Sequence, residues 1–522
     1  MFAGAREHAL YPRPDAPTRD NRQSVDNPQL ASNPQSARNP QSARNPQSAR
    51  NPQSAIRIGR DIGTVLRHSV GLSAWKQFRD SRWSLRVNPS SGNLHPTEAY
   101  VVAGAVEGLA GTPAVYHYAP DRHAVDERCV LAPAAWSAAM GGEDDAWLVA
   151  LTSIHWREAW KYGERAFRYC QHDLGHAVAA VAIAAGLVGR QVRMLPDWSA
   201  RDIASLTGID RDDDYVDAER EEAGCVLLVS RGSPAVNREV LLEAVAAGTW
   251  SGRASQLSED HVQWTFIDEI AEATRDPGRA ASSAIPASAV PPPDSPAPCV
   301  SYPPRLLLQR RSAVSFDGRG SIGAEAFFTM LSRVMPDAAA PWDSLWWDAR
   351  IHLLLFVHRV NGLDPGAYVL VRHPAALDRL RAACGRTFEW TPAHASLPLF
   401  LLARGDCRAL AERVSCDQAI AGEGFFSLGM LADFDRSLEQ FGPGFYRHLF
   451  WESGVVGQVL YLEAEAAGVR GTGIGCFYDD PVHDVLGLTG HTFQSLYHFT
   501  IGTPVEDTRL TTEPGYAWET GA

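Results

Sequence analysis

The segment from Asn88 to Glu98 carries the residue types best suited to bind a small molecule. Two serines, Ser90 and Ser91, and one amide, Asn93, lie in a loop bounded by prolines. Hydroxyl groups, an amide and exposed backbone N–H groups together suit a flat heteroaromatic ring with several acceptors, or a phosphate. A capped turn before a helix would use the same residues. The segment alone therefore leaves a binding loop and a structural turn open.

Two adjacent arginines in the second part of the chain form another candidate group. Arg310 and Arg311 are followed directly by Ser312, and paired guanidinium groups hold a dianionic phosphate by charge-assisted hydrogen bonds. Further on, Gly473 and Gly475 would let the backbone approach a ring closely, because glycine has no Cβ. For each arginine taken singly, a surface ion pair is the alternative interpretation. It is the combination that indicates a phosphate-bearing ligand.

Two segments of low complexity divide the chain. Residues 1–56 contain few apolar residues and the hexapeptide NPQSAR, which starts at Asn33, Asn39 and Asn45, so we expect a disordered tail. Residues 276–304 are rich in proline, which indicates an extended linker. The expected organisation is a disordered tail (1–56), a first domain (57–235), a helical arm with the Pro-rich linker (236–304), a second domain (305–510) and a C-terminal tail (511–522).

The two domains carry matching landmarks in the same order and at one constant spacing. Phe167-Arg168, Gly175 and Gly189 of the first domain recur in the second as Tyr446-Arg447, Gly454 and Gly468. Four apolar segments are typical of strands, namely 99–103, 225–230, 351–357 and 497–501. The segments 167–188 and 446–467 predict long helices that are apolar on nearly all sides and are therefore buried, here against each other. The pattern predicts an α+β fold in two tandem copies that form an intrachain pseudo-dimer.

Composition and charge exclude several classes of protein. The 522 residues are 45% hydrophobic and 21% charged, which is ordinary for a globular protein and unlike a coiled coil. The net charge of −13 argues against binding to nucleic acid or to an anionic membrane. No apolar run reaches the length that spans a bilayer, and the N-terminus has no signal-peptide core. The 8 cysteines contain no CxxC pair, so we expect reduced thiols in a cytoplasmic protein.

One cluster of acidic residues with a histidine has a spacing that would permit a metal ion. It comprises Asp479, Asp480, His483 and Asp484. Asp480 followed by Pro481 is also typical of the start of a short helix, which is a sufficient reason for these residue types. We therefore expect no metal site in this chain.

Several of these segments resemble one family of flavoproteins. The sequence PSSGNLHPTEAYVV, residues 89–102, resembles the flavin-site motif of the nitroreductase-like FMN oxidoreductases in their SagB-type dehydrogenase form. This branch includes the azoline oxidases of thiazole- and oxazole-modified peptide pathways. Further similarities lie in the Lys-Tyr signature (160–169), the Arg-Arg-Ser start (309–312), the Gly-rich turn (471–477) and the C-terminal strand with its basic residue (502–509).

The resemblance implies a nitroreductase-like fold with FMN held between two subunits, each of which contributes different motifs. The first domain has the serine loop, but it has Arg67-His68-Ser69 where the Arg-Arg-Ser motif would be and residues 193–196 where the Gly-rich turn would be. The second domain has both of these motifs, but it has only residues 341–344 in place of the serine loop. We expect one composite FMN site formed by Ser90, Ser91, Asn93, Arg310, Arg311, Ser312, Gly473, Gly475 and Arg509. The alternative is that the domains pair structurally and neither binds flavin.

The same resemblance supplies a function. Lys161 and Tyr162 match the pair implicated in proton removal in the azoline oxidases, where hydride passes to flavin N5. A buried Lys161 would act as the base and Tyr162 would orient or relay the proton, whereas the alternative is a solvated lysine beside a core tyrosine. The implied activity is FMN-dependent dehydrogenation of a small molecule or a modified peptide, with partner proteins of a biosynthetic pathway. An NAD(P)H-dependent nitro- or quinone-type reductase and a flavin-free scaffold are the alternatives.

Overall fold

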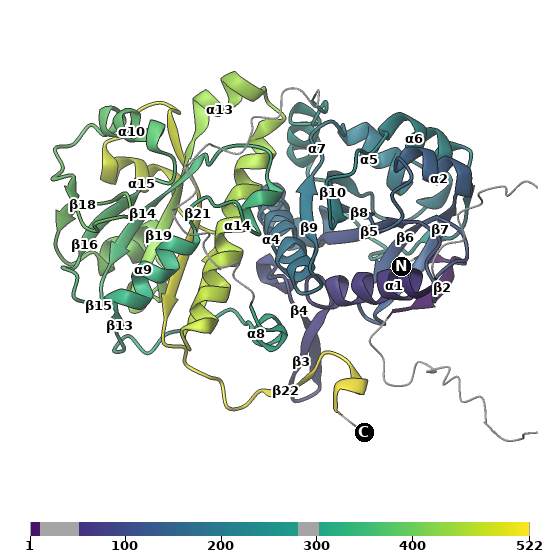
Figure 1. Cartoon of the computed structure of the whole chain (residues 1–522). Coiled ribbons are helices and arrows are strands. Elements are labelled where there is room, and N and C mark those ends of the chain that lie inside the picture. The colour runs from purple at the N-terminus through teal and green to yellow at the C-terminus, as the bar shows by residue number, and fades with distance from the viewer. Residues whose placement is uncertain (1, 11–51, 280–301, 521–522) are drawn as a thin grey trace, which may run out of the picture.

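The computed structural model describes residues 2–10, 52–279 and 302–520. The NPQSAR repeats and most of the Pro-rich linker lie outside these residues. Figure 1 shows two halves side by side, with the long helices α4 (Ala166–Gly186) and α14 (Phe445–Ala466) between their sheets. Among the described helices, none combines the length and the apolar character that crossing a bilayer requires.

Each half contains an antiparallel sheet, and the two sheets share one strand order. In the first half the order is β7 (Ala124–Val130), β6 (Ala114–Ala119), β5 (Thr97–Ala103), β8 (Trp147–Ser153), β10 (Glu222–Ser230) and β9 (Gln191–Met194). In the second half the order is β18 (Leu399–Arg404), β16 (Gly366–Leu370), β14 (Ile351–Val357), β19 (Phe426–Asp433), β21 (Phe493–Gly502) and β20 (Arg470–Ile474). The predicted strands are confirmed as β5, β10, β14 and β21.

Strand β14 illustrates why these sheets are buried on both faces. Successive side chains of a strand point to opposite faces, so Leu353 and Leu355 join the central core with α14, while Leu354 and Phe356 pack in a second cluster. That second cluster is covered by α10 (Leu377–Ala383), α11 (Arg408–Val414) and α15 (Asp479–Leu486). In the first half the outer face is covered in the same way by α2 (Pro133–Ala139), α5 (Ala200–Thr207) and α6 (Arg238–Ala246).

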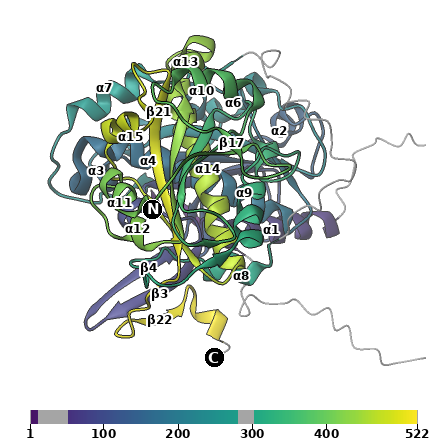
Figure 2. The same cartoon turned by 90° about the vertical axis from the view of Figure 1, so that its left-hand side faces the viewer.

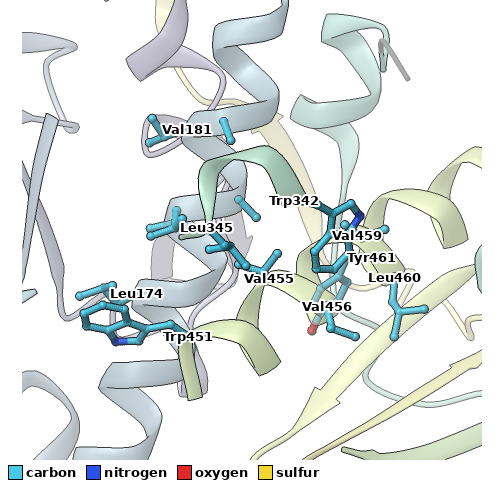
Figure 3. Close-up of a cluster of buried hydrophobic side chains, with 14 of the residues drawn as sticks. Leu174, Val181, Trp342, Leu345, Trp451, Val455, Val456, Val459, Leu460 and Tyr461 are labelled. Carbon is cyan, nitrogen blue, oxygen red and sulfur yellow. The ribbon is translucent and has the colours of Figure 1, made fainter. Parts of the chain in front are cut away.

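The centre of the molecule is the contact between α4 and α14. Both helices are buried over nearly their whole length, as their continuous apolar sequence predicts. Figure 3 shows Leu174 of α4 beside Trp451 of α14, and Val181 and Val455 belong to the same cluster. The side chains of the two halves therefore form one continuous core across the interface, as in an obligate dimer.

Residues 2–10 and 511–520 are part of the folded structure, which differs from the expected tails. At the N-terminus, β1 (Phe2–Ala3) pairs with β12 (Arg253–Ala254) and β2 (Arg6–Ala9) pairs with β7. Phe2 is buried and packs edge-on against Tyr100, which anchors this short arm. The low apolar content of residues 1–56 as a whole hid this local apolar anchor.

The C-terminal segment crosses back to the first half. Strand β22 (Thr511–Pro514) pairs with β3 (Leu72–Phe78), which forms a hairpin with β4 (Ser81–Arg86). Figure 2 shows this hairpin projecting from the body of the molecule with β22 beside it. Beyond β22, the hydroxyl of Tyr516 accepts a hydrogen bond from the backbone N–H of Leu72 (3.0 Å). Residues 511–514 are exposed, so their sequence carried no apolar signal for a strand.

The remaining helices cover the edges of the two halves or lead into their sheets. The expected helical arm after the first domain contains α6 and α7 (Thr265–Ala273), and α7 packs against α4. The others are α1 (Pro52–Arg67), α3 (Trp156–Tyr162), α8 (Pro304–Gln309), α9 (Ala324–Arg333), α12 (Ile420–Glu423) and α13 (Phe434–Phe441).

Candidate functional site

The serine loop lies at the start of β5 and is held by α4. The backbone N–H of Ser91 donates to Asp173 Oδ1 (3.1 Å), and the Ser91 hydroxyl donates to the same oxygen (3.3 Å). Asn93 donates from Nδ2 to the carbonyl oxygen of Ser84 (2.8 Å), which ties the loop to β4. Gly92 has a φ of +59°, which glycine adopts without strain. The loop is thus fixed from both sides before any ligand arrives.

Lys161 and Tyr162 end helix α3 directly beside this loop. A Cβ atom at Gly92 would collide with the Tyr162 hydroxyl and lie 3.1 Å from Lys161 Nζ, so both side chains reach the loop. Tyr162 is half-buried, and its ring packs edge-on against Tyr169 at 4.8 Å. Lys161 is exposed, so the buried base that the sequence suggested is absent at this position. The reason is that α3 is amphipathic and turns Glu158 and Ala159 inward.

Arg310 and Arg311 follow helix α8 and reach across to the first half. Arg310 is buried and donates from Nε to the carbonyl oxygen of Val87 (3.0 Å). Its Nη1 atom has no hydrogen-bond partner among the described residues. Arg311 donates to the carbonyl oxygens of Leu308 (2.8 Å) and Arg310 (2.7 Å). The buried Nη1 is therefore a donor left available, since buried polar groups ordinarily have a partner.

Two further cations, which the sequence motifs did not indicate, lie with this pair. Lys76 comes from the β3–β4 hairpin and Arg470 from the first position of β20, and both line the same cavity. Burial lowers the pKa of Arg311 to about 10, and the charges of Arg310 and Arg470 act in the same direction. Burial and the charge of Arg311 also lower the pKa of Lys76. Burial is the largest cause of both shifts, and the carboxylates of Glu465 and Glu506 act against them. The cluster therefore combines three arginines and a lysine with two glutamates, and its cations are the groups suited to an anion.

Tyr461 of α14 organises the Gly-rich turn. Its hydroxyl accepts a hydrogen bond from the backbone N–H of Gly473 (2.8 Å) and lies 2.9 Å from the Ser312 hydroxyl. A Cβ atom at Gly475 would collide with the ring of Tyr169 of the first half. Glycine at position 475 therefore allows the chain directly after β20 to approach α4 closely.

These groups from both halves line one cavity of about 880 Å³. Its walls include the serine loop and Tyr162 from the first half, and the arginine pair and Gly-rich turn from the second. The residues predicted from sequence that line it are Ser90, Ser91, Asn93, Tyr162, Arg310, Arg311, Ser312, Gly473 and Gly475.

Arg509 is not among the residues that line the cavity, although Asp507 and Leu510 on either side of it are. The residue is exposed, and its guanidinium donates to both carboxylate oxygens of Asp507 (2.8 and 2.7 Å). After β21 ends at Gly502, the chain leaves the sheet toward the hairpin, and Arg509 lies over the ring of Phe78. The basic residue that lines the cavity from this side is Arg470.

A pair of buried carboxyl groups lies behind the serine loop. Glu158 is fully buried, and neither of its carboxylate oxygens has a hydrogen-bond partner among the described residues. Burial raises the pKa of Glu158 to about 10, and the neighbouring Asp173 adds to this shift. Burial also raises the pKa of Asp173 to about 7. An acidic residue within an apolar helix, as Asp173 is in α4, was the sequence signal for this pair.

The corresponding position on the other side of the pseudo-dimer is filled by side chains. Met194 of β9 stands where β20 has Gly473, and it is buried. The short turn Trp342–Ser344 lies against β9 in place of a serine loop, with the Trp342 ring covered by Arg372. Figure 3 shows Trp342 in the same buried cluster as Val455 and Val459 of α14. Arg67, at the place of Arg310, pairs with Glu519.

Comparison with solved structures identifies the fold. A protein described as a nitroreductase from Anabaena variabilis matches 86% of this chain and 88% of its own length, with a TM-score of 0.62 and 19% identity. The E. coli microcin synthetase McbBCD complex, with truncated pro-MccB17 bound, matches 38% of this chain and 70% of that chain at 18% identity and a TM-score of 0.29. Nitroreductase A from Vibrio parahaemolyticus matches 39% of this chain and 66% of that chain at 18% identity and a TM-score of 0.24.

The first of these matches spans both halves, and the chain has a nitroreductase fold, as its sequence predicts. The mixed α+β architecture and the facing of two similar halves are confirmed with it. No protein-family model matches the sequence, and no curated protein matches it either. At this level of identity the similarity describes the fold, so function has to be argued from the cavity.

Proposed function

We propose that this chain is an FMN-dependent oxidoreductase with one flavin site per chain, located in the cavity between its halves. The observation that supports this function is the shared cavity itself. It brings the serine loop of the first half to the arginine pair and Gly-rich turn of the second. These are the motifs that resemble the two sides of a flavin site, and each half carries only its own set.

The residues present fit FMN at both ends of the cavity. Lys76 and the free Nη1 of Arg310 are suited to a phosphate, because both are cationic groups at the cavity and the buried Nη1 has no partner among the described residues. Arg470 lies in the same wall and already pairs with Glu465 and Glu506. The Ser90 hydroxyl offers a polar atom for the edge of a ring system. Tyr162 and Tyr169 add aromatic surface beside it. The volume of about 880 Å³ is within the range of cofactor and substrate pockets.

A bound flavin would supply the two-electron acceptor for a substrate hydride. The chain would supply the binding of the phosphate, the orientation of the substrate and the removal of its proton. Tyr162 is the better placed of the two predicted catalytic residues because it lines the cavity, and Lys161 Nζ lies beside it at the loop. We propose that Tyr162 contacts the substrate and that Lys161 supports the transfer of its proton to solvent.

Resemblance of the motifs favours dehydrogenation of the SagB type, with an azoline or a related small molecule as the hydride donor. An NAD(P)H-dependent reductase would use the same cavity with the nicotinamide as donor. Anaerobic mixing of the purified protein with NADPH or with an azoline peptide separates the two, because the flavin absorbance is lost only with a competent donor. Bleaching by the azoline and not by NADPH is the expected result.

The stoichiometry of flavin tests the site itself. Acid release followed by quantitation should give one FMN per chain, because side chains fill the corresponding position at Met194 and Trp342. Two FMN per chain would contradict the composite site. If the protein bound no flavin after reconstitution, the flavin-free scaffold would be the remaining interpretation.

A further inference from the structure

Two cysteines that are distant in sequence face each other at the rim of the cavity. The backbone N–H of Tyr478 donates to the carbonyl oxygen of Val414 (2.9 Å). Gln418 donates from Nε2 to the carbonyl oxygen of Cys476 (3.1 Å). The segment 414–418 therefore runs antiparallel to the segment 476–478, because Val414 meets Tyr478 and Gln418 meets Cys476. Cys416 lies between the two contacts on its segment and is brought opposite Cys476.

The thiol groups themselves are neighbours. Burial raises the pKa of Cys416 to about 11, and the Cys476 thiol is the next largest cause of the shift. Cys476 is exposed and lines the cavity, whereas Cys416 is half-buried. Arg165 donates to the carbonyl oxygen of Gly475 (3.1 Å), which brings a positive charge to the same place. The thiolate is the nucleophilic form of cysteine, and exposure makes Cys476 the accessible thiol of the two.

The turn that carries Cys416 is held in a conformation that its residues rarely adopt. Cys416 and Asp417 have φ values of +62° and +54°, in the left-handed region that disfavours residues other than glycine. Such conformations persist where surrounding contacts impose them. Here the Tyr478 hydroxyl donates to Asp417 (3.1 Å) and the Gln418 side chain binds the opposite segment. These contacts hold the Cys416 side chain toward Cys476.

We propose that Cys416 and Cys476 are a redox pair that closes to a disulfide across the rim of the cavity. The oxidant is a low-molecular-weight disulfide such as oxidised glutathione. The exposed Cys476 thiolate attacks one sulfur of that disulfide and forms a mixed disulfide, and one small thiolate leaves. Cys416 loses its proton and attacks the Cys476 sulfur, and the second small thiolate leaves. Two protein thiols are oxidised and one small disulfide is reduced to two thiols.

The bond would join two segments that both contribute to the cavity wall. Gln418 and Cys476 line the cavity, and Gly475 precedes the second cysteine. A disulfide requires Cα atoms about 4.4–6.8 Å apart, which fixes the separation of the two segments. The pair would therefore lock these two neighbouring segments of the cavity wall together according to the thiol status of its surroundings. This inference concerns the rim and does not depend on which ligand occupies the cavity.

The test uses the full-length protein treated with oxidised glutathione, followed by alkylation of the remaining thiols and peptide mass mapping. We expect a cross-linked peptide that joins Cys416 to Cys476, loss of alkylation at both, and recovery with dithiothreitol. Cys384 and Cys407, which are also only half-buried, serve as internal controls and should stay alkylated.

Single variants separate pairing from simple reactivity. In Cys416→Ser, glutathione should remain on Cys476 as a stable adduct, because the resolving thiol is gone. In Cys476→Ser, Cys416 should stay free. A stable glutathione adduct on Cys476 in the unsubstituted protein, free thiols at both positions, or equal oxidation of Cys384 and Cys407 would each overturn the proposal.

Discussion

Gly175 of α4 and Gly454 of α14 mark the point where the two central helices touch backbone to backbone. A Cβ atom at Gly175 would lie 2.7 Å from Trp451 Cα, and one at Gly454 would collide with the carbonyl oxygen of His172, the residue that corresponds to Trp451 in the other half. The contacts are reciprocal between corresponding residues, as at the two-fold axis of a symmetric dimer. This close crossing sets the distance between the halves and so the width of the cavity they share.

The first prediction concerns this crossing. Gly454→Ala should lower the free energy of unfolding by about 1–3 kcal/mol, because the new methyl group meets backbone atoms that cannot rotate away. The measurement is urea denaturation followed by tryptophan fluorescence.

Gly186→Ala is the matched control, since Gly186 lies near the end of α4 with no atom within 4 Å of the Cβ position. It should be neutral or slightly stabilising, by up to about 1 kcal/mol from helix propensity. Equal stability of the Gly454 and Gly186 variants would mean that the helices do not cross where the structure has them.

The second prediction tests the phosphate end of the proposed flavin site. Lys76→Gln should weaken FMN binding roughly 10-fold, because it removes one charge-assisted contact. Riboflavin, which has the same ring but no phosphate, should bind both proteins equally. Quenching of flavin fluorescence during titration gives both dissociation constants.

Arg82→Gln is the control for this experiment. Arg82 lies in the same hairpin but pairs with Glu513 and is exposed to solvent, outside the cavity lining. The FMN affinity of the Arg82→Gln protein should match that of the unsubstituted protein. If Lys76→Gln weakened the binding of riboflavin and of FMN to the same extent, the cations would not be recognising a phosphate.

The third prediction separates the two catalytic candidates. Tyr162→Phe should keep its flavin and lose roughly 100-fold in turnover, the usual size of an effect on proton transfer. Lys161→Met should also keep its flavin and show a smaller loss, since its side chain is exposed and acts from behind the cavity wall.

Glu164→Gln, an exposed change two residues further along, should leave turnover unaltered. The required readouts are flavin content per chain and initial rates with a competent hydride donor. Loss of flavin from Tyr162→Phe would assign this tyrosine to binding, and an unchanged rate would remove it from the reaction.

The sequence predicted the parts of this fold that rest on apolar periodicity. The buried strand at 351–357 has the bounds of β14, and the helices predicted at 167–188 and 446–467 differ from α4 and α14 by one or two residues. The strand β22 was missed because its residues are exposed and pair through their backbones, which leaves no pattern of side chains.

The site was predictable only where a motif is contiguous. The serine loop and the Arg-Arg-Ser segment are short motifs, and both line the cavity. Lys76 and Arg470 are single cations on strands with no surrounding motif, and only the packing of the halves brings them together. Arg509 belongs to a recognisable segment, yet the chain direction after β21 carries it to Asp507 instead.

The fourth prediction follows from the buried carboxyl pair. The pKa of Glu158 is raised to about 10 by burial and by Asp173, whereas in the unfolded chain it is near 4.3. Between these values the folded state retains a proton that the unfolded chain has released, so the free energy of unfolding falls as pH rises. The stabilisation is complete below the unfolded pKa and is lost progressively as the pH rises through the folded pKa. Glu158→Gln keeps a neutral side chain of the same shape and removes this dependence.

Urea denaturation between about pH 5 and about pH 9 should therefore show the Glu158→Gln protein gaining stability relative to the unsubstituted one, by at most about 1.4 kcal/mol per pH unit. Near pH 5 the two should be similar, because the carboxyl group is protonated in the fold. Glu269→Gln, an exposed change on α7, should follow the unsubstituted protein at every pH. Parallel curves for Glu158→Gln and the unsubstituted protein would mean that Glu158 is ionised in the fold, with the neighbouring Lys161 as its counter-charge.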